Sequence, residues 1–208
     1  ASVTYVGAKF KLYRNHSGTT DGVGNAVVGT VSGTSISFGT PVAFNSGNNN
    51  NMDICFDSSN NKVVIAWEDK GNSEYGTAIV GTVDPSDNSI SFGSAVVFES
   101  AAVEEISIVF DSSNNKVVIA YKDEGNSDYG TAIVGTVSGT SISFGSATVF
   151  NSANTRETHS DFDSTNNKVI IGYRDNGNSS YGHAIVGTVS GTSISFGTEV
   201  TFRSGTTN

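Results

Sequence analysis

Short apolar runs separated by polar, glycine-rich loops follow one another along the whole chain. Residues 106–150 show the pattern clearly, with runs at 106–110, 116–121, 130–137 and 141–150 that are rich in Val, Ile, Tyr and Phe. Alternation and β-branched residues are typical of strands, and Asp, Ser, Asn and Gly between the runs favour turns. No stretch of useful length has the helical period. The pattern therefore predicts short antiparallel strands joined as a four-stranded meander.

The meander is repeated. The segment Ala-Ile/Val-Val-Gly-Thr-Val begins at Ala26, Ala78, Ala132 and Ala184, at spacings of 52, 54 and 52 residues. A unit of this size rarely buries a core alone, so the repeat predicts a single domain of stacked units. The boundaries are placed at 1–47, 48–101, 102–153 and 154–208, and these segments are called the first to fourth unit below. The first unit departs most, with strands expected at 2–7 and 9–13.

Tandem four-stranded units predict an all-β fold, a β-propeller of four blades of about 52 residues each. A trefoil would need three units, and a solenoid would need shorter repeats. Equivalent glycines indicate a close neighbouring backbone or a bulge, and equivalent phenylalanines are expected to pack between blades. These positions are Gly29, Gly81, Gly135 and Gly187, and Phe38, Phe92, Phe144 and Phe196. A closed ring and an open half that pairs with a second chain are both compatible with the repeat.

One hairpin carries a family resemblance. Residues 187–196, Gly-Thr-Val-Ser-Gly-Thr-Ser-Ile-Ser-Phe, resemble the Asp-box hairpin Ser/Thr-x-Asp-x-Gly-x-Thr-Trp/Phe of sialidase-like propellers. Each unit keeps the turn and the aromatic residue, while the Asp of the box is missing. The resemblance covers all four units at the level of architecture and implies a fold, not an activity.

Composition and charge limit the kinds of partner that the chain is expected to bind. The 208 residues carry a formal charge of −9, with 11 Lys and Arg against 20 Asp and Glu and no basic cluster. A nucleic-acid backbone would be repelled, and no apolar run approaches the ~20 residues that a membrane-spanning helix needs. The Ser-, Thr-, Asn- and Gly-rich, lysine-poor composition favours an extracellular or virion-surface protein.

The segments between units are the variable part of the repeat. They read Asn-Asn-Asn-Asn at 48–51, Ala-Val-Glu-Glu at 102–105 and Asn-Thr-Arg-Glu at 154–157, followed by Asp53, Ser107 and His159 at equivalent positions. Variation confined to one set of loops suggests that they contact something different in each unit, although drift in tolerant loops explains it equally well. Glu104, Arg156 and His159 are the candidate contacts.

A second loop is repeated instead, at 69–76, 123–130 and 175–182. Carboxylate and amide groups beside an aromatic ring are the groups that bind sugars. Asx turns and a packing tyrosine explain the same pattern without a ligand, and this interpretation is favoured. The candidate ligand-binding residues are Trp67, Asp69, Asn72 and Tyr75, then Tyr121, Asp123, Asn126 and Tyr129, then Tyr173, Asp175, Asn178 and Tyr181.

Catalytic and metal signatures are sparse. No Gly-x-Ser-x-Gly, P-loop or dinucleotide motif occurs, and the four arginines do not occupy matching positions, so we expect no catalytic residues and no enzyme. Asp161 stands where other units have Cys55 and Val109, and could gather with Glu104, Glu105, Glu157 and His159 as a carboxylate site. Asp84 and Asp87 are weak candidates for Ca²⁺; no other metal or cofactor is expected.

The function expected from these observations is recognition without catalysis. Multivalent, lectin-like carbohydrate binding comes first, with glycans or a cell-surface or virion component as partner and a homo-oligomer as a possible state. The alternative is a structural repeat domain of a surface filament, phage fibre or adhesin. A glycosidase acting on polysaccharide comes third.

Overall fold

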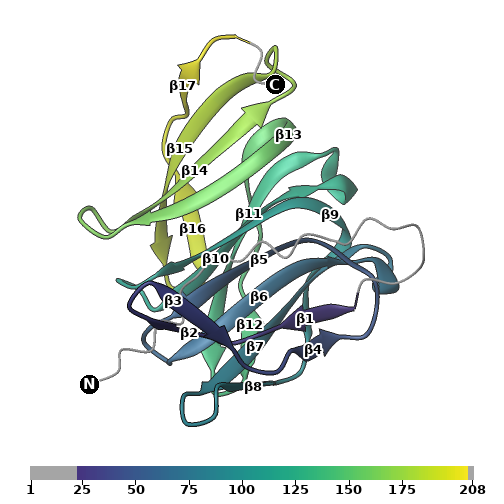
Figure 1. The fold of residues 1–208 in the computed structure, drawn as a ribbon. Helices are drawn as coiled ribbons and strands as arrows, with labels where there is room; N and C mark the ends of the chain where they lie inside the picture. The colour runs from purple at the N-terminus through teal and green to yellow at the C-terminus, as the bar shows by residue number, and fades with distance from the viewer. Residues whose placement is uncertain (1–22, 206–208) are drawn as a thin grey trace.

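The computed structural model describes residues 23–205 and is built almost wholly of antiparallel strands (Figure 1). The elements are β1 (Gly24–Ala26), β2 (Gly29–Ser32), β3 (Ser35–Phe38), β4 (Val42–Asn45), β5 (Asn49–Asp57), β6 (Lys62–Asp69), β7 (Tyr75–Asp84), β8 (Ser89–Phe92), β9 (Val96–Asp111), β10 (Lys116–Asp123), β11 (Tyr129–Ser138), β12 (Ser141–Phe144), β13 (Thr148–Asp163), β14 (Lys168–Asp175), β15 (Tyr181–Ser190), β16 (Ser193–Phe196) and β17 (Val200–Arg203), with 3₁₀ turns at Lys70–Asn72 and Glu124–Asn126.

The all-β class is confirmed, but the four-bladed propeller is wrong. Thirteen strands form one sheet, in the order β16-β15-β14-β13-β11-β10-β9-β7-β6-β5, with β8, β12 and β17 paired at the ends of β7, β11 and β15. The remaining pairs, β1–β4 and β2–β3, form two small sheets. Within residues 23–205 no strand pairing joins the last unit to the first, so the sheet does not close.

Two long strands explain the difference. Residues expected to form the last strand of one unit and the first strand of the next are continuous in β9 and β13, which have 16 residues each. The first half of β9 pairs with β7 of the second unit, and its second half pairs with β10 of the third unit. Hydrogen bonding therefore continues from unit to unit, and the proposed boundaries at 101/102 and 153/154 fall inside strands.

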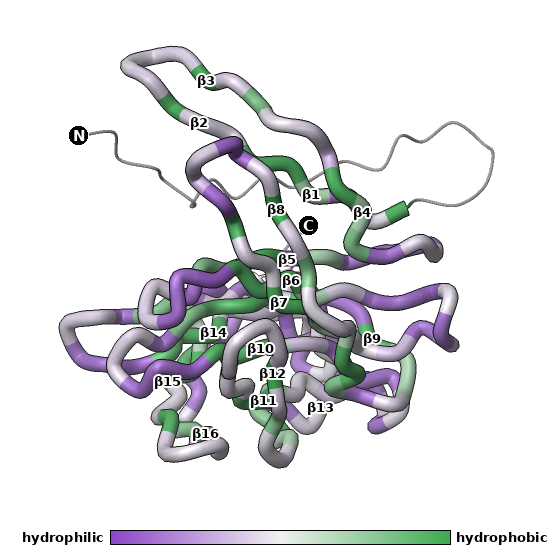
Figure 2. The backbone as a smooth tube through the Cα atoms, turned by 90° about the horizontal axis from the view of Figure 1, so that it is seen from below, coloured by the Kyte–Doolittle hydropathy of each residue, from purple (hydrophilic) through white to green (hydrophobic). Residues whose placement is uncertain are grey.

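The core lies between successive units. In β6 and β7, Val64, Ala66, Ala78 and Val80 point to the third unit, where they meet alternate residues of β10 and β11: Val117, Ile119, Tyr121 and Ile133. The intervening residues of β10 and β11 form a second cluster with the fourth unit. Because side chains alternate along a strand, each internal unit is buried on both faces. In Figure 2 the apolar segments run through the interior and the hydrophilic loops lie at the rim.

The expected packing of the repeated phenylalanines between units is confirmed for Phe92, Phe144 and Phe196, whereas Phe38 of the first unit is 55% exposed. Phe144 of the third unit lies 5.7 Å from Phe98 of the second unit, measured between ring centroids. Phe98 also packs edge-on against Tyr121, at 5.3 Å. The same arrangement recurs at the next interface, where Phe150 contacts both Phe196 and Tyr173. Each interface therefore contains an aromatic cluster contributed by both units.

The expectation for the repeated glycines is wrong. The atoms nearest to a methyl group at Gly81 or Gly135 belong to side chains of the same unit, Val63 and Phe92 or Ile142 and Phe144, and not to a neighbouring backbone. The strand register does not shift at either glycine. Backbones approach closely at other glycines: a methyl at Gly93 would lie 1.8 Å from the Thr140 carbonyl oxygen of the next unit. These glycines are therefore needed for the units to stack at this distance.

Of the first unit, only residues 23–47 are described, as β1 to β4. The strands expected at 2–7 and 9–13 lie outside the described residues. Phe44 of β4 packs against Trp67 of the second unit at 5.1 Å, so the described part of the first unit joins the stack through the same aromatic contact as the others.

Candidate functional site

The aspartates of the repeated loop are occupied by backbone hydrogen bonds. Asp69, Asp123 and Asp175 each end the second strand of their unit, and each accepts from an N–H group two or three residues later. Asp69 accepts from Gly71 at 3.1 Å, and Asp123 accepts from Asn126 at 3.1 Å. Burial raises the pKa of Asp123 despite these bonds. The carboxylates thus close Asx turns that shape the loop.

The aromatic residues that precede these aspartates lie in the interior. Trp67, Tyr121 and Tyr173 are almost completely buried at the interfaces between units. The hydroxyl of Tyr121 donates to Glu99 at 3.1 Å, and the hydroxyl of Tyr173 donates to Glu199. Burial, with the nearby carboxylate, raises the pKa of Tyr121. No face of these three rings is available to cover a sugar.

The other predicted sugar contacts remain at the surface. Three asparagines at the loop tips are exposed, and three tyrosines that begin the next strand are half-buried: Asn72, Asn126 and Asn178, and Tyr75, Tyr129 and Tyr181. The predicted set is therefore divided between surface and interior. No ligand tests it, and sugar binding by the exposed part stays a prediction.

The variable segments form bulges at one edge of the stack. Asn51, Glu105 and Glu157 have positive φ angles of 43°, 54° and 52°. Strand register shifts at these points, so each bulge turns its side chain out of the ladder. The strand that contains each bulge pairs with the second strand of its unit. That second strand carries a charged residue at one repeat position: Glu68 in the second unit, Lys122 in the third and Arg174 in the fourth. The edge therefore combines the variable segments with one variable strand position.

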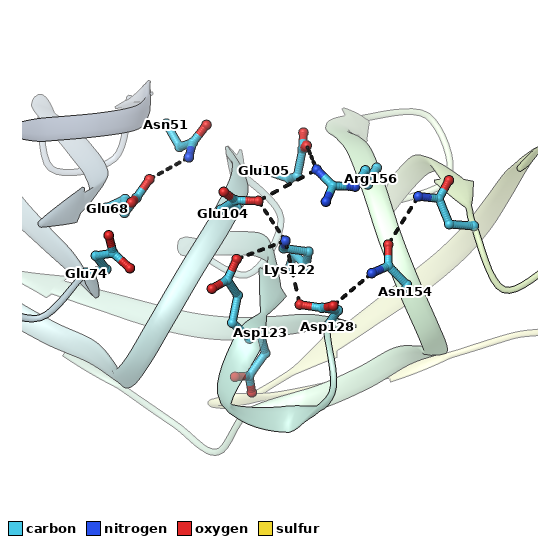
Figure 3. A network of polar contacts seen from close by, with 12 residues as sticks. Asn51, Glu68, Glu74, Glu104, Glu105, Lys122, Asp123, Asp128, Asn154 and Arg156 are labelled. Carbon is cyan, nitrogen blue, oxygen red and sulfur yellow. Dashed lines mark hydrogen bonds and ion pairs between the residues drawn. The ribbon is translucent and has the colours of Figure 1, made fainter. Parts of the chain in front are cut away.

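Lys122 is the centre of this edge (Figure 3). Its side chain is buried, and its Nζ lies 2.6 Å from Glu104, 2.9 Å from Glu124 and 3.6 Å from Asp128. Burial opposes its charge, but hydrogen bonds to Glu104 and Glu124 outweigh burial and raise its pKa. Lys122 is thus a permanently charged, fully paired group under the edge.

The second unit carries the opposite charge at the same position. Glu68 is buried and lies 2.6 Å from the Nζ of Lys70, which also pairs with Glu74 at 2.9 Å. Asn51 donates to the other oxygen of Glu68 at 2.6 Å. The central residue is negative in the second unit and positive in the third, and the groups that pair with it differ accordingly. The second and third units therefore carry opposite charges at the same buried position, and each unit neutralises its charge with a partner of the other sign.

The third and fourth units are linked across the edge. Arg156 lies 3.8 Å from Glu104 and 3.9 Å from Glu105, which also accepts from the backbone N–H of Glu157 at 3.0 Å. Asn154 donates to Asp128 of the third unit at 2.8 Å, as Figure 3 shows. Variable residues of one unit thus contact variable residues of the next.

The carboxylate group expected around His159 is not assembled. Glu104, Glu105 and Glu157 are linked through Arg156 and the backbone. His159 and Asp161 are exposed and lie beside Gly172 and Ile170 of β14, on the outer face of the fourth unit. The predicted residues therefore serve two different surfaces.

The candidate Ca²⁺ residues form an ordinary turn. Asp84 accepts from the backbone N–H and the hydroxyl of Ser86 at 2.8 and 2.7 Å, and Asp87 accepts from Ser89 at 2.9 Å. Hydrogen bonds from Ser86 lower the pKa of Asp84. Among residues 23–205, no group of three or more His, Cys, Asp or Glu side chains is placed to hold a metal ion. The described part also has no helix with the length and apolarity to span a membrane.

Comparison with known proteins adds no assignment, because no family model, curated protein or solved structure matches the chain. Glu68, Lys122 and Arg174 were not predicted from the sequence to belong to the edge. The available signal was their alignment: each stands between the buried aromatic residue and the turn aspartate of its unit, and their charges differ from unit to unit.

Proposed function

We propose that this chain is a structural repeat module, whose stacked units form a rigid body within an extended assembly, and that it is not an enzyme. The observation that supports this proposal most is that the residues repeated in every unit make their contacts inside the protein. The repeated aromatic rings are buried between units, and the repeated aspartates hold backbone turns. Repetition of these buried residues keeps the interface between units the same, since every unit must fit the next.

The variable edge supports the same role. Lys122 and Glu68 occupy equivalent buried positions with opposite charges; within their own units Lys122 pairs with Glu104 and Glu124, and Glu68 pairs with Lys70. Arg156 then joins the third unit to the fourth. Nearly identical units could stack in the wrong order or register, and mismatched charges at a contact oppose that. In this proposal the variable segments identify each unit to its neighbour.

Titration of the chain against a panel of soluble glycans tests the proposal, with the Asp123→Ala variant measured in parallel. The structural role predicts no saturable binding by either protein. It also predicts that the variant loses about 1 kcal/mol of stability, because Asp123 caps a turn. Saturable binding that Asp123→Ala abolishes without loss of stability would contradict the proposal.

Glycan binding at the edge is the second candidate function. It is favoured by the equivalent placement of the bulges at Asn51, Glu105 and Glu157 and by the exposed asparagines of the repeated loop, which give several similar polar sites per chain. Weak sites of this kind add by avidity. In the same titration, more than one equivalent site per chain that survives Asp123→Ala would favour this candidate over the structural role.

A further inference from the structure

The outer face of the fourth unit is exposed, although its equivalents are buried. Ile170 and Val186 are 38% and 45% exposed, whereas the equivalent Val118 and Val134 of the third unit are both at 0%. Phe202 is 65% exposed, whereas the equivalent Phe150 is at 7%. In the third unit this face is covered by the fourth unit. The fourth unit therefore ends in an uncovered face that keeps apolar residues of the interface, with Asp161 at the position where the third unit has Val109.

The opposite face of the first unit is exposed in the complementary way. Val31 and Ile36 are 51% and 42% exposed. In the third unit the equivalent Val137 and Ile142 are 7% and 3% exposed, because they pack on the second unit. The described part of the first unit thus presents two residues of the other half of the interface that recurs inside the stack.

A glycine gives independent evidence for the same geometry. A methyl at Gly145 would lie 1.9 Å from the carbonyl oxygen of Thr192 in the fourth unit. At the equivalent Gly197, the nearest atom to such a methyl is 3.8 Å away, within the same unit. Gly197 is therefore a glycine at the position of close approach, although no neighbouring unit lies against it. The equivalent of Thr192 in the first unit is Thr34, which is exposed.

A hydrogen-bonding position also repeats towards this face. Asp53 of the second unit accepts from the backbone N–H of Ile108 in the third unit at 3.0 Å. Ser107 of the third unit accepts from the N–H of Ser160 in the fourth unit at 2.9 Å. The fourth-unit residue at this position is His159, whose side chain is exposed on the outer face.

We propose that the outer face of the fourth unit binds the first unit of a second copy of this chain, head to tail, and reproduces the interface between internal units. Such an interface is heterologous, so it builds a ring if the rotation closes and a filament if it does not. The inference builds on the structural role proposed above and names its partner.

Sedimentation velocity of the full chain over a wide concentration range tests the proposal. The wild-type chain is expected to self-associate, and Gly197→Ala and Phe202→Asp are each expected to weaken association roughly thirty-fold or more. Gly197→Ala is the sharper variant, since its methyl meets no atom of its own chain closer than 3.8 Å. Its unfolding midpoint should equal that of the wild type. Ser112→Asp adds a charge at an exposed turn of the third unit and should change nothing.

Mixing variants tests the head-to-tail direction. A Phe202→Asp chain keeps only its first-unit face, and an Ile36→Asp chain keeps only its fourth-unit face. Each alone is expected to stay monomeric, and the mixture is expected to form a one-to-one complex and nothing larger.

Three results would overturn the proposal. One is a wild-type chain that stays monomeric at every concentration. This result would also follow if the first unit of the same chain covered the outer face of the fourth unit. Another is self-association of Ile36→Asp alone, which would mean that two fourth-unit faces bind each other. The third is wild-type association by the Gly197→Ala chain. Since the glycan titration does not depend on self-association, a monomeric chain that binds no glycan would reject this inference and leave the structural role in place.

Discussion

At the residue scale, one position per unit sets the polar chemistry of the edge. Glu68 and Lys122 are equivalent, buried and opposite in charge, and each has oppositely charged groups within hydrogen-bonding distance. A buried charge is costly without its partners, so neither side of such a pair can change alone. The differences between units at this position are therefore coupled to differences in the segments that surround it.

Removal of the Lys122 side chain should be destabilising. Lys122→Ala removes the charge-assisted hydrogen bonds to Glu104 and Glu124 and leaves these carboxylates and Asp128 close together without their shared cation, and we expect a loss of roughly 1.5 to 3 kcal/mol in urea unfolding. Glu124→Ala is the control, because Glu124 is half-exposed and its removal leaves Lys122 paired with Glu104 and Asp128, so it should cost less than about 1 kcal/mol. Equal losses for the two variants would contradict this account of the edge.

Glu99 should make stability depend on pH. Burial, together with the charge of Asp123, raises the pKa of Glu99 above its ordinary value of 4.5. A carboxyl with a raised pKa holds its proton more tightly in the folded state, so the free energy of unfolding falls as pH rises from 4.5 through the raised value. Urea unfolding across this range should show a fall that Glu99→Gln reduces, leaving the contribution of Asp123, whose pKa is also raised by burial.

Tyr121→Phe provides the opposite control. The hydroxyl of Tyr121 donates to Glu99 and lowers the pKa of that carboxyl, although burial outweighs it. Its loss should raise the pKa of Glu99 further and move the fall in stability to higher pH. A Tyr121→Phe chain with the wild-type pH dependence would show that Glu99 is not the titrating group.

At the element scale, β9 and β13 decide the architecture. Each joins the last strand of one unit to the first strand of the next and bends at a bulge beside Glu105 or Glu157. Residues 96–102 of β9 pair with β7 and residues 103–111 pair with β10, and the bulge at Glu105 lies within the second part. The long strands thus convert four separate meanders into one continuous sheet.

The sequence predicted most strands but not their continuity. Apolar alternation marks β10, β11 and their equivalents, because those strands are buried on both faces. Residues 151–157, Asn-Ser-Ala-Asn-Thr-Arg-Glu, are polar and suggested a loop, yet they form strand. Backbone pairing with β11 and β14 holds this segment extended whatever its side chains, and side-chain patterns do not record that.

The candidate site was predictable only in part, for a related reason. Asp123 was correctly placed in a turn-forming loop, where the Asx interpretation agrees with the hydrogen bond to Asn126. The pairing of Lys122 with Glu104 was not predictable, since it depends on the strand register at the bulge. Register is a tertiary property here, because several slips would keep the polar residues outside.

The bulge conformation should favour glycine. Glu157 has a φ of 52°, which costs a non-glycine residue about 1 to 2 kcal/mol, while its 3.4 Å pair with Arg174 is half-exposed and weak. Glu157→Gly should therefore be neutral or stabilising by up to about 1 kcal/mol, measured by urea unfolding. Glu157→Val removes the same pair but keeps the strain, and should destabilise; a more stable Val variant would contradict the strained bulge.

At the scale of the whole molecule, the units form an open stack. The interfaces between the second and third units and between the third and fourth units each combine an aromatic cluster, a glycine packed against a carbonyl oxygen and a hydrogen bond at an equivalent position. Both ends of the described stack present residues that are buried at those interfaces. Stability in such arrays is approximately a sum over units and nearest-neighbour interfaces, so an internal unit can be added without changing the others.

Lengthening the chain by one internal unit tests this open stack most directly. A second copy of residues 102–153, inserted after residue 153, should fold and pack between its neighbours; Glu104 of the copy is changed to Gln, because it takes the place of Arg156 against Glu104 and Glu105 of the original unit. Small-angle X-ray scattering, with Phe202→Asp present to prevent self-association, should show a maximum dimension about 10 Å greater than that of the unlengthened Phe202→Asp chain, the thickness of one packed sheet layer. A lengthened chain that unfolds, or that folds without becoming longer, would contradict the open stack.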